Sequence, residues 1–326
     1  MRRIFSILLL TVGFSFGKNS SEKPFIEEHL YHKHRFDFVN ASVFQQTKDF
    51  SAFYNTTHLF MYLDLSETEQ LFINNSLTLG NGLNNRFLKR GFTVQPSGDD
   101  LEDATNNINN TGRKYILELW YKRKFDKSVF IAGIIDSASF IDENRCANDE
   151  HTQFLNPVLI NNPIAPIYSY NPGIYIKKGN DKFAIKTIFI KNTPDTGNTG
   201  ILQFNFSKDG INIRPYYYHT FADYENKGIG ISSDITVNGK GIFIRGGKGF
   251  DNNDIFLSAG FQLESVIKDD RIAFGTGYID QDRKKYVYEI YYLYKFNWFL
   301  SCSLDLQIIK ERKSENIFGL RVYISY

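Results

Sequence analysis

Apolar and polar residues alternate one by one along most of this 326-residue chain, up to its final residue. The last nine residues, FGLRVYISY, place Phe318, Leu320, Val322, Ile324 and Tyr326 at every second position. Successive side chains of a β-strand point to opposite faces, so this spacing predicts a strand with one wholly apolar face. Because helical spacing is hard to find in the rest of the chain, we predict an all-β protein.

The same alternation recurs in LFINNSLTL, YVYEIYYLYKF and WFLSCSLDLQII, where ionisable side chains, if present, fall on one face. In RKYILELWYKRKF, residues 113–125, it sets Leu117 and Leu119 on one face and Ile116, Glu118 and Trp120 on the other. We therefore expect Leu117 to point outwards with the apolar set and Ile116 to point inwards.

Strands are predicted around residues 39, 59, 75, 119, 132, 175, 187, 204, 214, 232, 244, 259, 274, 291, 304 and 321, which gives about sixteen. Tight-turn signals such as Asp126-Lys127, Asp209-Gly210 and Asn238-Gly239 fall at even-numbered connections. The two long segments, residues 80–112 and 137–170, fall at odd-numbered ones. Short turns at one end and long loops at the other are typical of outer-membrane barrels.

The composition suits a wall that is apolar on one side and wet on the other. Aromatic residues make up 16% of the chain, with 30 Phe and 20 Tyr, yet the mean hydropathy is −0.33. Inside a bilayer every backbone group must be paired, so strands survive there only in a closed barrel whose last strand bonds to the first. We predict a transmembrane antiparallel β-barrel over residues 35–326, with Tyr326 in an aromatic girdle.

The N-terminus, MRRIFSILLLTVGFSFGK, has two arginines before an apolar run and reads as a signal peptide over residues 1–17. A short buried helix is the alternative. Residues 18–34 then form a periplasmic segment, and the expected location is a Gram-negative-type bacterial outer membrane. Removing two of the 38 basic residues leaves 36 against 36 acidic ones, a neutral balance that argues against a nucleic-acid partner.

Residues 113–163, from RKYILELWYKRKF to QFLNPVLINNP, and residues 288–326, from YEIYYLYKF to the end, resemble the carbohydrate-selective porin family. The resemblance implies a sixteen-stranded channel for passive uptake of mono- and oligosaccharides. It also implies that the loop after residue 136 folds into the barrel and narrows it. The family usually has a basic residue where this chain has Ile134, so the charge at the constriction is not implied.

A path for sugars needs ionised groups that hydrogen-bond to hydroxyls and aromatic rings that stack on C–H faces. The alternative for each wall candidate is a solvated residue of the barrel wall whose charge pairs with a neighbouring charge. The alternative for each loop candidate is a surface loop residue. The predicted wall residues are Glu118, Trp120, Lys122, Asp136, Arg214, Glu289, Asp305, Gln307 and Arg321, and the predicted constriction-loop residues are Asp142, Glu143, Arg145, Asp149, Glu150 and Gln153.

Three other functions compete with a sugar-selective porin: a general diffusion porin, a barrel enzyme or adhesin, and a soluble secreted sandwich. We see no catalytic motif, cofactor motif or metal-ligand spacing, and expect no enzyme activity. The expected partners are sugars in transit, outer-membrane lipid and the assembly machinery, which would read the C-terminal strand. A homotrimer and a single bridge between Cys146 and Cys302 are both left open by the sequence.

Overall fold

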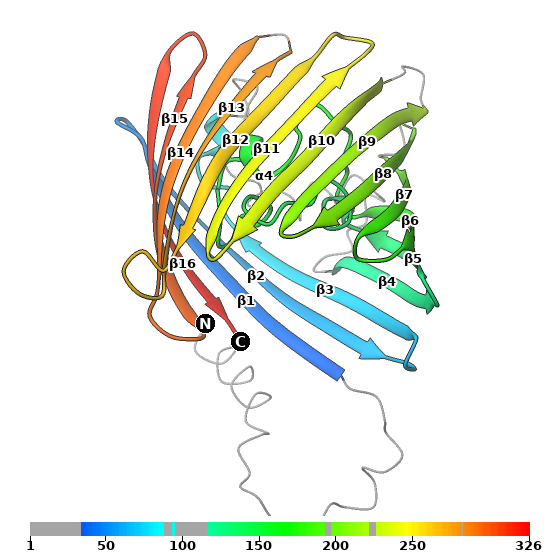
Figure 1. Cartoon of the computed structure of the whole chain (residues 1–326). Helices are drawn as coiled ribbons and strands as arrows, with labels where there is room; N and C mark the ends of the chain where they lie inside the picture. The colour runs from blue at the N-terminus through cyan, green and yellow to red at the C-terminus, as the bar shows by residue number, and fades with distance from the viewer. Residues whose placement is uncertain (1–33, 88–92, 95–115, 193–196, 222–225, 282) are drawn as a thin grey trace, which may run out of the picture. The chain divides into compact units, whose positions relative to one another are not determined.

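Sixteen antiparallel strands form one closed barrel in the computed structural model of the chain (Figure 1). Each strand pairs with its neighbours in sequence, and β1 pairs with β16. The predicted fold class and strand number are confirmed, and every predicted strand centre lies inside a strand. The strands are β1 (His34–Gln46), β2 (Ser51–Asp64), β3 (Glu69–Leu79), β4 (Ile116–Phe125), β5 (Ser128–Ile135), β6 (Asn171–Gly179), β7 (Phe183–Lys191), β8 (Asn198–Lys208), β9 (Ile211–Phe221), β10 (Asn226–Val237), β11 (Lys240–Gly249), β12 (Ile255–Glu264), β13 (Asp270–Asp280), β14 (Lys284–Lys295), β15 (Leu300–Lys310) and β16 (Ser314–Ser325).

The structure describes residues 34–87, 93–94, 116–192, 197–221, 226–281 and 283–326. The predicted signal peptide, residues 1–17, therefore lies outside the described residues. So does the predicted periplasmic segment, residues 18–34, except for its last residue, where β1 begins. Most of the predicted long loop over residues 80–112 also lies outside them.

The barrel closes at the very end of the chain. Phe38 and Tyr326 exchange both of their backbone hydrogen bonds, each 2.8 Å long. From there β1 and β16 stay in register, from Val39 opposite Ser325 to Gln46 opposite Phe318. The strand can run to the last residue because closure leaves no sheet edge to protect.

The two faces of the strands separate as predicted, with one exception in β4. In β16, Leu320 is 37% exposed on the outside while Arg321 is 1% exposed on the inside. In β4, a bulge opposite Asn74 and Asn75 inserts Leu117 as an extra residue. The expected faces of Ile116 and Leu117 were wrong, because a bulge shifts the alternation by one residue. Ile116 points outwards and Leu117 is buried.

Tight turns occupy the end of the barrel where the even-numbered connections lie. Asp209-Gly210 and Asn238-Gly239 both have two residues in the left-handed region, with φ of 51° and 83° in the first and 49° and 73° in the second. Such turns match the twist of a hairpin, and Gly adopts that conformation without steric cost. The two long connections, residues 80–115 and 136–170, are odd-numbered, as predicted.

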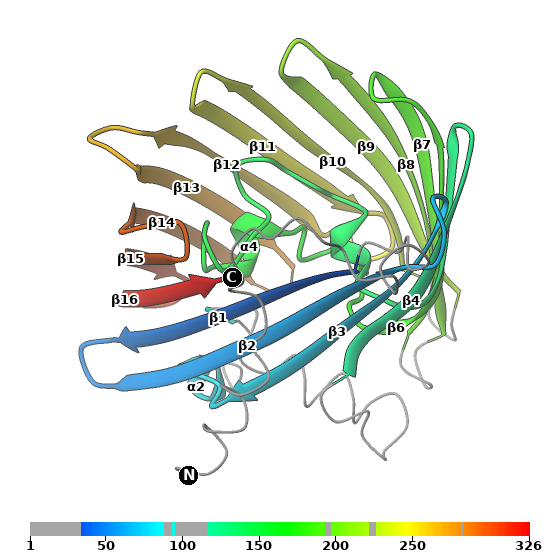
Figure 2. The ribbon, with the colours of Figure 1, turned by 90° about the horizontal axis from the view of Figure 1, so that it is seen from below.

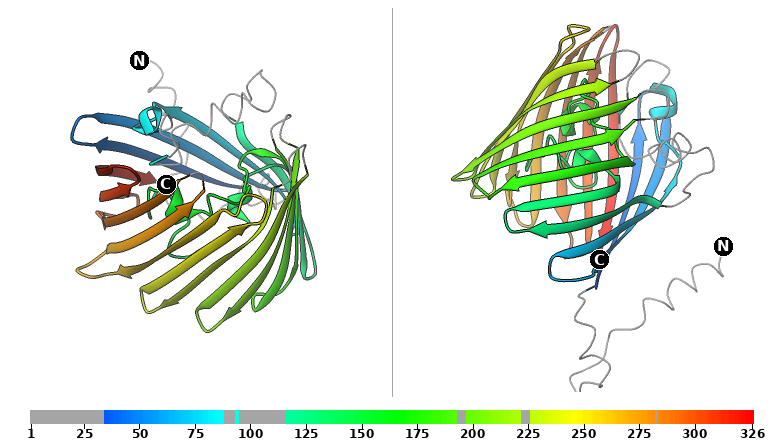
Figure 3. Two further views of the ribbon diagram at one scale, coloured as in Figure 1. Left: turned by 90° about the horizontal axis from the view of Figure 1, so that it is seen from above. Right: turned by 90° about the vertical axis from the view of Figure 1, so that its right-hand side faces the viewer.

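The β5–β6 connection lies inside the ring of strands, as the views along the barrel show (Figures 2 and 3). It contains the 3₁₀ turn η3 (Ser137–Ser139) and the short helix α4 (Pro157–Ile160). The β3–β4 connection contains α2 (Asn84–Phe87). None of the helices in the described part of the chain is long and apolar enough to cross a membrane.

Candidate functional site: the barrel interior

The β5–β6 connection, residues 136–170, fills part of the barrel interior with its own apolar side chains; we call it the inner loop. Phe154 is fully buried and packs edge-on against Tyr291 of β14, with ring centroids 5.1 Å apart. The ring centroid of Phe243 in β11 lies 5.6 Å from that of Phe154. These contacts confirm the predicted inward position of the loop, whose apolar residues would otherwise lie in water.

Arg245 of β11 clamps the inner loop from the inner face of the barrel. Its Nε lies 3.2 Å from Oδ2 of Asp142, and both side chains are fully buried. Its terminal nitrogens donate to the backbone carbonyls of Leu159, at 2.7 Å, and of Asp142, at 3.0 Å. Two loop segments seventeen residues apart are thus held by one guanidinium group, which can supply five donors in a fixed geometry.

Arg321, a predicted wall residue, holds the loop in the same way. Its terminal nitrogens donate to the carbonyls of Glu150, at 2.6 Å, and of Gln153, at 2.7 Å. The carboxylate of Asp305 lies 3.2 Å away and balances the charge. The loop end near residue 150 is therefore fixed to β15 and β16.

Glu289 and Gln307 bind the start of α4. Glu289 accepts hydrogen bonds from the backbone amides of Leu155, at 2.6 Å, and Asn156, at 2.9 Å. Asn156 caps the helix with its side-chain oxygen and donates from its side-chain nitrogen to Gln307. Gln307 also donates to the carbonyl of Val94, so the β3–β4 connection reaches the same point in the interior.

A third group of contacts fixes the beginning of the loop to β7–β10. Lys186 forms an ion pair with Glu143, and the side-chain oxygen of Gln203 accepts from the amide of Asp142 at 2.9 Å. Arg214 pairs with Asp234 at 2.6 Å, beside the loop. The sequence did not single out Lys186, Gln203, Asp234 or Arg245, although each occupies an inward position of its strand.

Seven of the predicted wall residues are buried beside the inner loop rather than facing open solvent. The pairs Arg321–Asp305 and Arg214–Asp234 correspond to the alternative in which wall charges pair with one another. Contact of these residues with a solute stays a prediction. Their exposed fractions are 6% for Glu118, 8% for Trp120, 7% for Arg214, 1% for Glu289, 2% for Asp305, 1% for Gln307 and 1% for Arg321.

A stack of aromatic rings lines the barrel interior along β2–β6. Phe72 lies between Tyr62, at 4.8 Å, and Trp120, at 4.4 Å, measured between ring centroids. Phe140 of the inner loop joins Trp120, at 6.4 Å, to Tyr175, at 4.6 Å. We call these five residues the aromatic array. Only Trp120 was predicted, although the alternation places the strand members inwards.

Polar groups border the aromatic array where solvent reaches it. The Lys122 amine donates to Gln70 at 2.7 Å and lies 5.8 Å from the centre of the Trp120 ring. The guanidinium of Arg35 lies 3.9 Å from the centre of the Tyr62 ring. Tyr62, Lys122 and Gln70 are half-buried, whereas Phe72, Trp120 and Tyr175 are buried, so Tyr62 is the accessible ring among the strand members of the array.

Glu118 and Asp136 join the array to the base of the inner loop. Glu118 accepts from Trp120 Nε1 at 3.3 Å, from Asn74 at 3.1 Å and from the amide of Asp136 at 3.2 Å. Asp136 in turn caps η3 by accepting from Ala138. Both predicted wall residues thus fix the point at which the loop leaves β5.

Three carboxyl groups of the inner loop are shifted towards their neutral form. Burial raises the pKa of Asp142 to about 6, against the opposing attraction of Arg245. Burial also raises the pKa of Asp136 and of Glu150. Because burial disfavours a charged carboxylate, the packed loop holds protons more tightly than a solvated loop.

The other predicted loop residues have local roles. Gln153 accepts from the amides of Asn148, at 2.6 Å, and Asp149, at 3.1 Å, which shapes the turn. Arg145 is exposed. Ile134 pairs with Leu119 on the outer face, so this position does not face the interior.

The described residues contain neither a disulfide nor a group of side chains placed to hold a metal ion. Cys146 and Cys302 are both free, so they do not form the disulfide bridge that the sequence left open. Among the residues that the structure describes, no group of three or more His, Cys, Asp or Glu side chains is placed to hold a metal ion.

Comparison with known sequences finds a relative but no family model. No protein-family model matches the chain. A protein of Aquifex aeolicus strain VF5, described as an uncharacterized protein, is 35% identical over 306 residues. The aligned region covers 92% of this chain and 97% of the relative.

Comparison with solved structures finds porin-like barrels at low sequence identity. A triple mutant of Rhodopseudomonas blastica porin aligns with a TM-score of 0.62 at 10% identity, over 90% of this chain and all of that one. Pseudomonas putida OprB at low pH aligns with a TM-score of 0.57 at 14% identity, over 90% and 92%. A loop-deletion mutant of the Vibrio cholerae outer-membrane protein OmpT gives 0.59 at 10% identity, over 90% and 99%. The chain therefore shares the fold of these proteins.

Proposed function

The chain belongs to the same protein family as the Aquifex aeolicus protein, and we propose that it is an outer-membrane porin for passive diffusion of carbohydrates. The sixteen-stranded fold, shared with porins, supports the channel and a Gram-negative-type outer membrane as its location. The inner loop supports a narrowed passage, since it lies inside the barrel and contacts strands from β2 to β16.

The aromatic array is the observation that carries the sugar assignment. Sugars present C–H faces that stack on aromatic rings and hydroxyls that bind to charged or amide groups. Half-buried Tyr62, with the Arg35 guanidinium over its ring, offers both kinds of group, and the half-buried Lys122 beside buried Trp120 adds an amine. The half-buried face of this array is the proposed wall of the solute path.

A single substitution in the array tests this assignment. In planar bilayers, purified protein should conduct ions, and maltodextrin should reduce the current. Tyr62→Ala should raise the sugar concentration for half-maximal reduction roughly tenfold, as loss of about 1.4 kcal/mol of stacking implies. Tyr286→Ala, which removes a 42% exposed outward ring, is the control and should leave it unchanged.

A general diffusion porin is the second candidate, and one observation favours it. Arg321, Glu289 and Gln307 form hydrogen bonds with the inner loop and so are not free to bind a solute. Ion conductance that is indifferent to every sugar tested would support this candidate against the first. Loss of conductance altogether would favour an enzyme or adhesin, for which a lipid-hydrolysis assay comes next.

A polar patch on the outer wall supports a homotrimer. Asn40 of β1 donates to Asn55 of β2 at 3.1 Å and to Thr57 at 2.7 Å, and Asn55 donates back to Asn40 at 3.1 Å and to Ser42 at 2.7 Å. These side chains alternate with inward ones and so lie on the outer face. Amides and hydroxyls are unfavourable against lipid but favourable between protein surfaces in a membrane. We therefore place the contact between copies at β1 and β2.

Native mass spectrometry in detergent tests the homotrimer. The unmodified protein should give trimers. Ser42→Trp should give monomers, because its ring would hold the surfaces apart, whereas Ile242→Trp on the 57% exposed outer face of β11 should not. A monomeric unmodified protein would contradict the proposal.

A further inference from the structure

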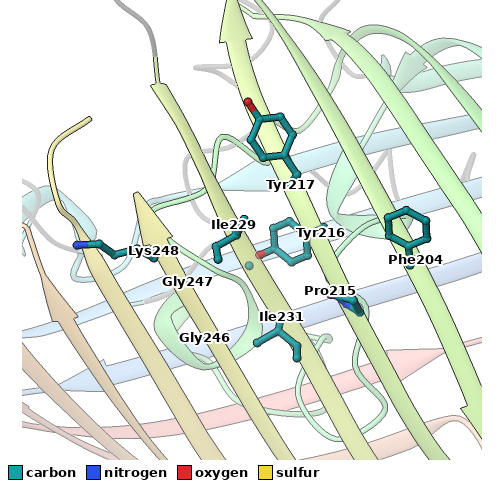
Figure 4. Close-up of a pocket in the computed structure, with 10 residues that line it drawn as sticks. Phe204, Pro215, Tyr216, Tyr217, Ile229, Ile231, Gly246, Gly247 and Lys248 are labelled. Atoms are coloured by element: carbon teal, nitrogen blue, oxygen red, sulfur yellow. The ribbon is translucent and has the colours of Figure 1, made fainter. Parts of the chain in front are cut away.

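The outer wall of the barrel carries an apolar groove that the channel function does not use. It lies over β8–β11, has a volume of about 580 Å³, and is bordered by Phe204, Pro215, Tyr217 and Ile231 (Figure 4). Side chains of this kind on a barrel exterior face the lipid.

The groove exists because two outward positions lack long side chains. Pro215, Ile231 and Gly246 lie in one row across β9, β10 and β11. A Cβ atom placed on Gly246 would lie 3.7 Å from its nearest neighbours, which is ordinary van der Waals contact, so a side chain fits at this position without a clash. Phe204 lines the groove on the β8 side, and Leu257 of β12 lies opposite Gly246 on the other side.

The wall beneath the groove is closed towards the interior. Gly230 pairs with Gly247, and a Cβ atom on Gly230 would lie 2.1 Å from the ring of Tyr216. That ring therefore lies against the bare backbone, and its hydroxyl accepts from Asn162 of the inner loop at 2.8 Å. The groove is thus separate from the solute path.

One positive charge stands at the rim without an acidic partner. The Lys248 amine contacts only the two oxygens of Asn253, at 2.9 and 3.3 Å, among the described residues. The neighbouring Lys227 is 3.8 Å from Asp251, which neutralises it. The groove therefore has an apolar floor with a cation and the hydroxyl-bearing Tyr217 at one end.

We propose that this groove binds one acyl chain of an anionic membrane lipid, whose phosphate group is bound by Lys248. Methylene groups fill apolar grooves, and lysines near the headgroup level attract anionic lipid. A second copy of the chain is disfavoured as occupant, because β10 lies eight strands from β2 in the ring, across from the polar patch.

Native mass spectrometry of the detergent-solubilised protein with added phosphatidylglycerol or phosphatidylcholine tests the site. We expect one molecule of phosphatidylglycerol to bind per chain, roughly fivefold more tightly than phosphatidylcholine, the effect of about one lysine. Lys248→Gln should abolish this preference. Gly246→Leu should fill the groove and abolish binding of both lipids, whereas Thr187→Leu, on the outer face of β7, should bind as the unmodified protein does.

The folded state of each variant is checked by its conductance, which should not change because the groove is closed to the interior. Lipid binding by Gly246→Leu equal to that of the unmodified protein would overturn the proposal. A Gly246→Leu variant that changes its oligomeric state but still binds lipid would also overturn the proposal, because the occupant of the groove would then be another copy of the chain.

Discussion

Single side chains of the barrel bind the inner loop, and Arg245 alone joins two of its segments, at Asp142 and at Leu159. The alternation of β11 is sufficient to place Arg245 inside the barrel, as it places Glu289 and Arg321 in β14 and β16. It could not predict that they bind loop carbonyls and amides, because that depends on the path of the loop.

Removing Arg245 alone should release the inner loop. Arg245→Met leaves Asp142 buried without its charged partner, which costs about 3–5 kcal/mol in buried ion pairs. We expect larger and noisier single-channel currents. The double variant with Asp142→Asn removes the orphaned charge and should restore much of the quiet current, and equal noise in both variants would contradict the role assigned to the pair.

The inner loop, as an element, was predicted in position but not in attachment. The family resemblance implied that the loop folds into the barrel, which the buried side chains of Phe154 and Leu155 confirm. Its contact with the β3–β4 connection through Gln307 and Val94 was not predicted, because nothing local to either segment encodes the other. The bulge at Leu117 escaped prediction for a related reason, since the sequence alternates smoothly through it while the pairing does not.

Acid should tighten the inner loop. Asp142, with its pKa raised to about 6, binds a proton more tightly in the packed loop than in water, and Asp136 and Glu150 shift the same way. Proton binding by these groups contributes fully to the free energy of loop packing below their aqueous pKa of about 4. This contribution is lost as the pH rises through the pKa values of the packed loop. For Asp142 the difference is on the order of 3 kcal/mol.

Hydrogen exchange of the loop amides checks this sign. After correction for the intrinsic rate, amides of residues 141–160 should be better protected at a pH of about 4.5 than at about 7. Asp142→Asn should lose most of that difference. Faster corrected exchange in acid would contradict the direction given by burial.

The barrel as an assembled object was the most predictable part, because alternation, turn spacing and closure all follow from short-range sequence. Phe38 and Tyr326 meet because sixteen strands return the chain to its start. The proposed solute path was least predictable, since it depends on the space that the inner loop leaves beside the aromatic array. The barrel as a whole rests on one premise: the outward positions of every strand face lipid, and the inward positions face water or the inner loop.

Spin labels along β14 test that premise most directly. Cysteines are placed one at a time from residue 286 to residue 293 after Cys146 and Cys302 are replaced by serine, and collision with oxygen, which concentrates in lipid, is measured in vesicles. Tyr286, Tyr288, Ile290 and Tyr292 positions should be highly accessible to oxygen and the Glu289 position should not, with a strict period of two. Uniform accessibility along the strand, or oxygen accessibility on the Glu289 face, would contradict the account.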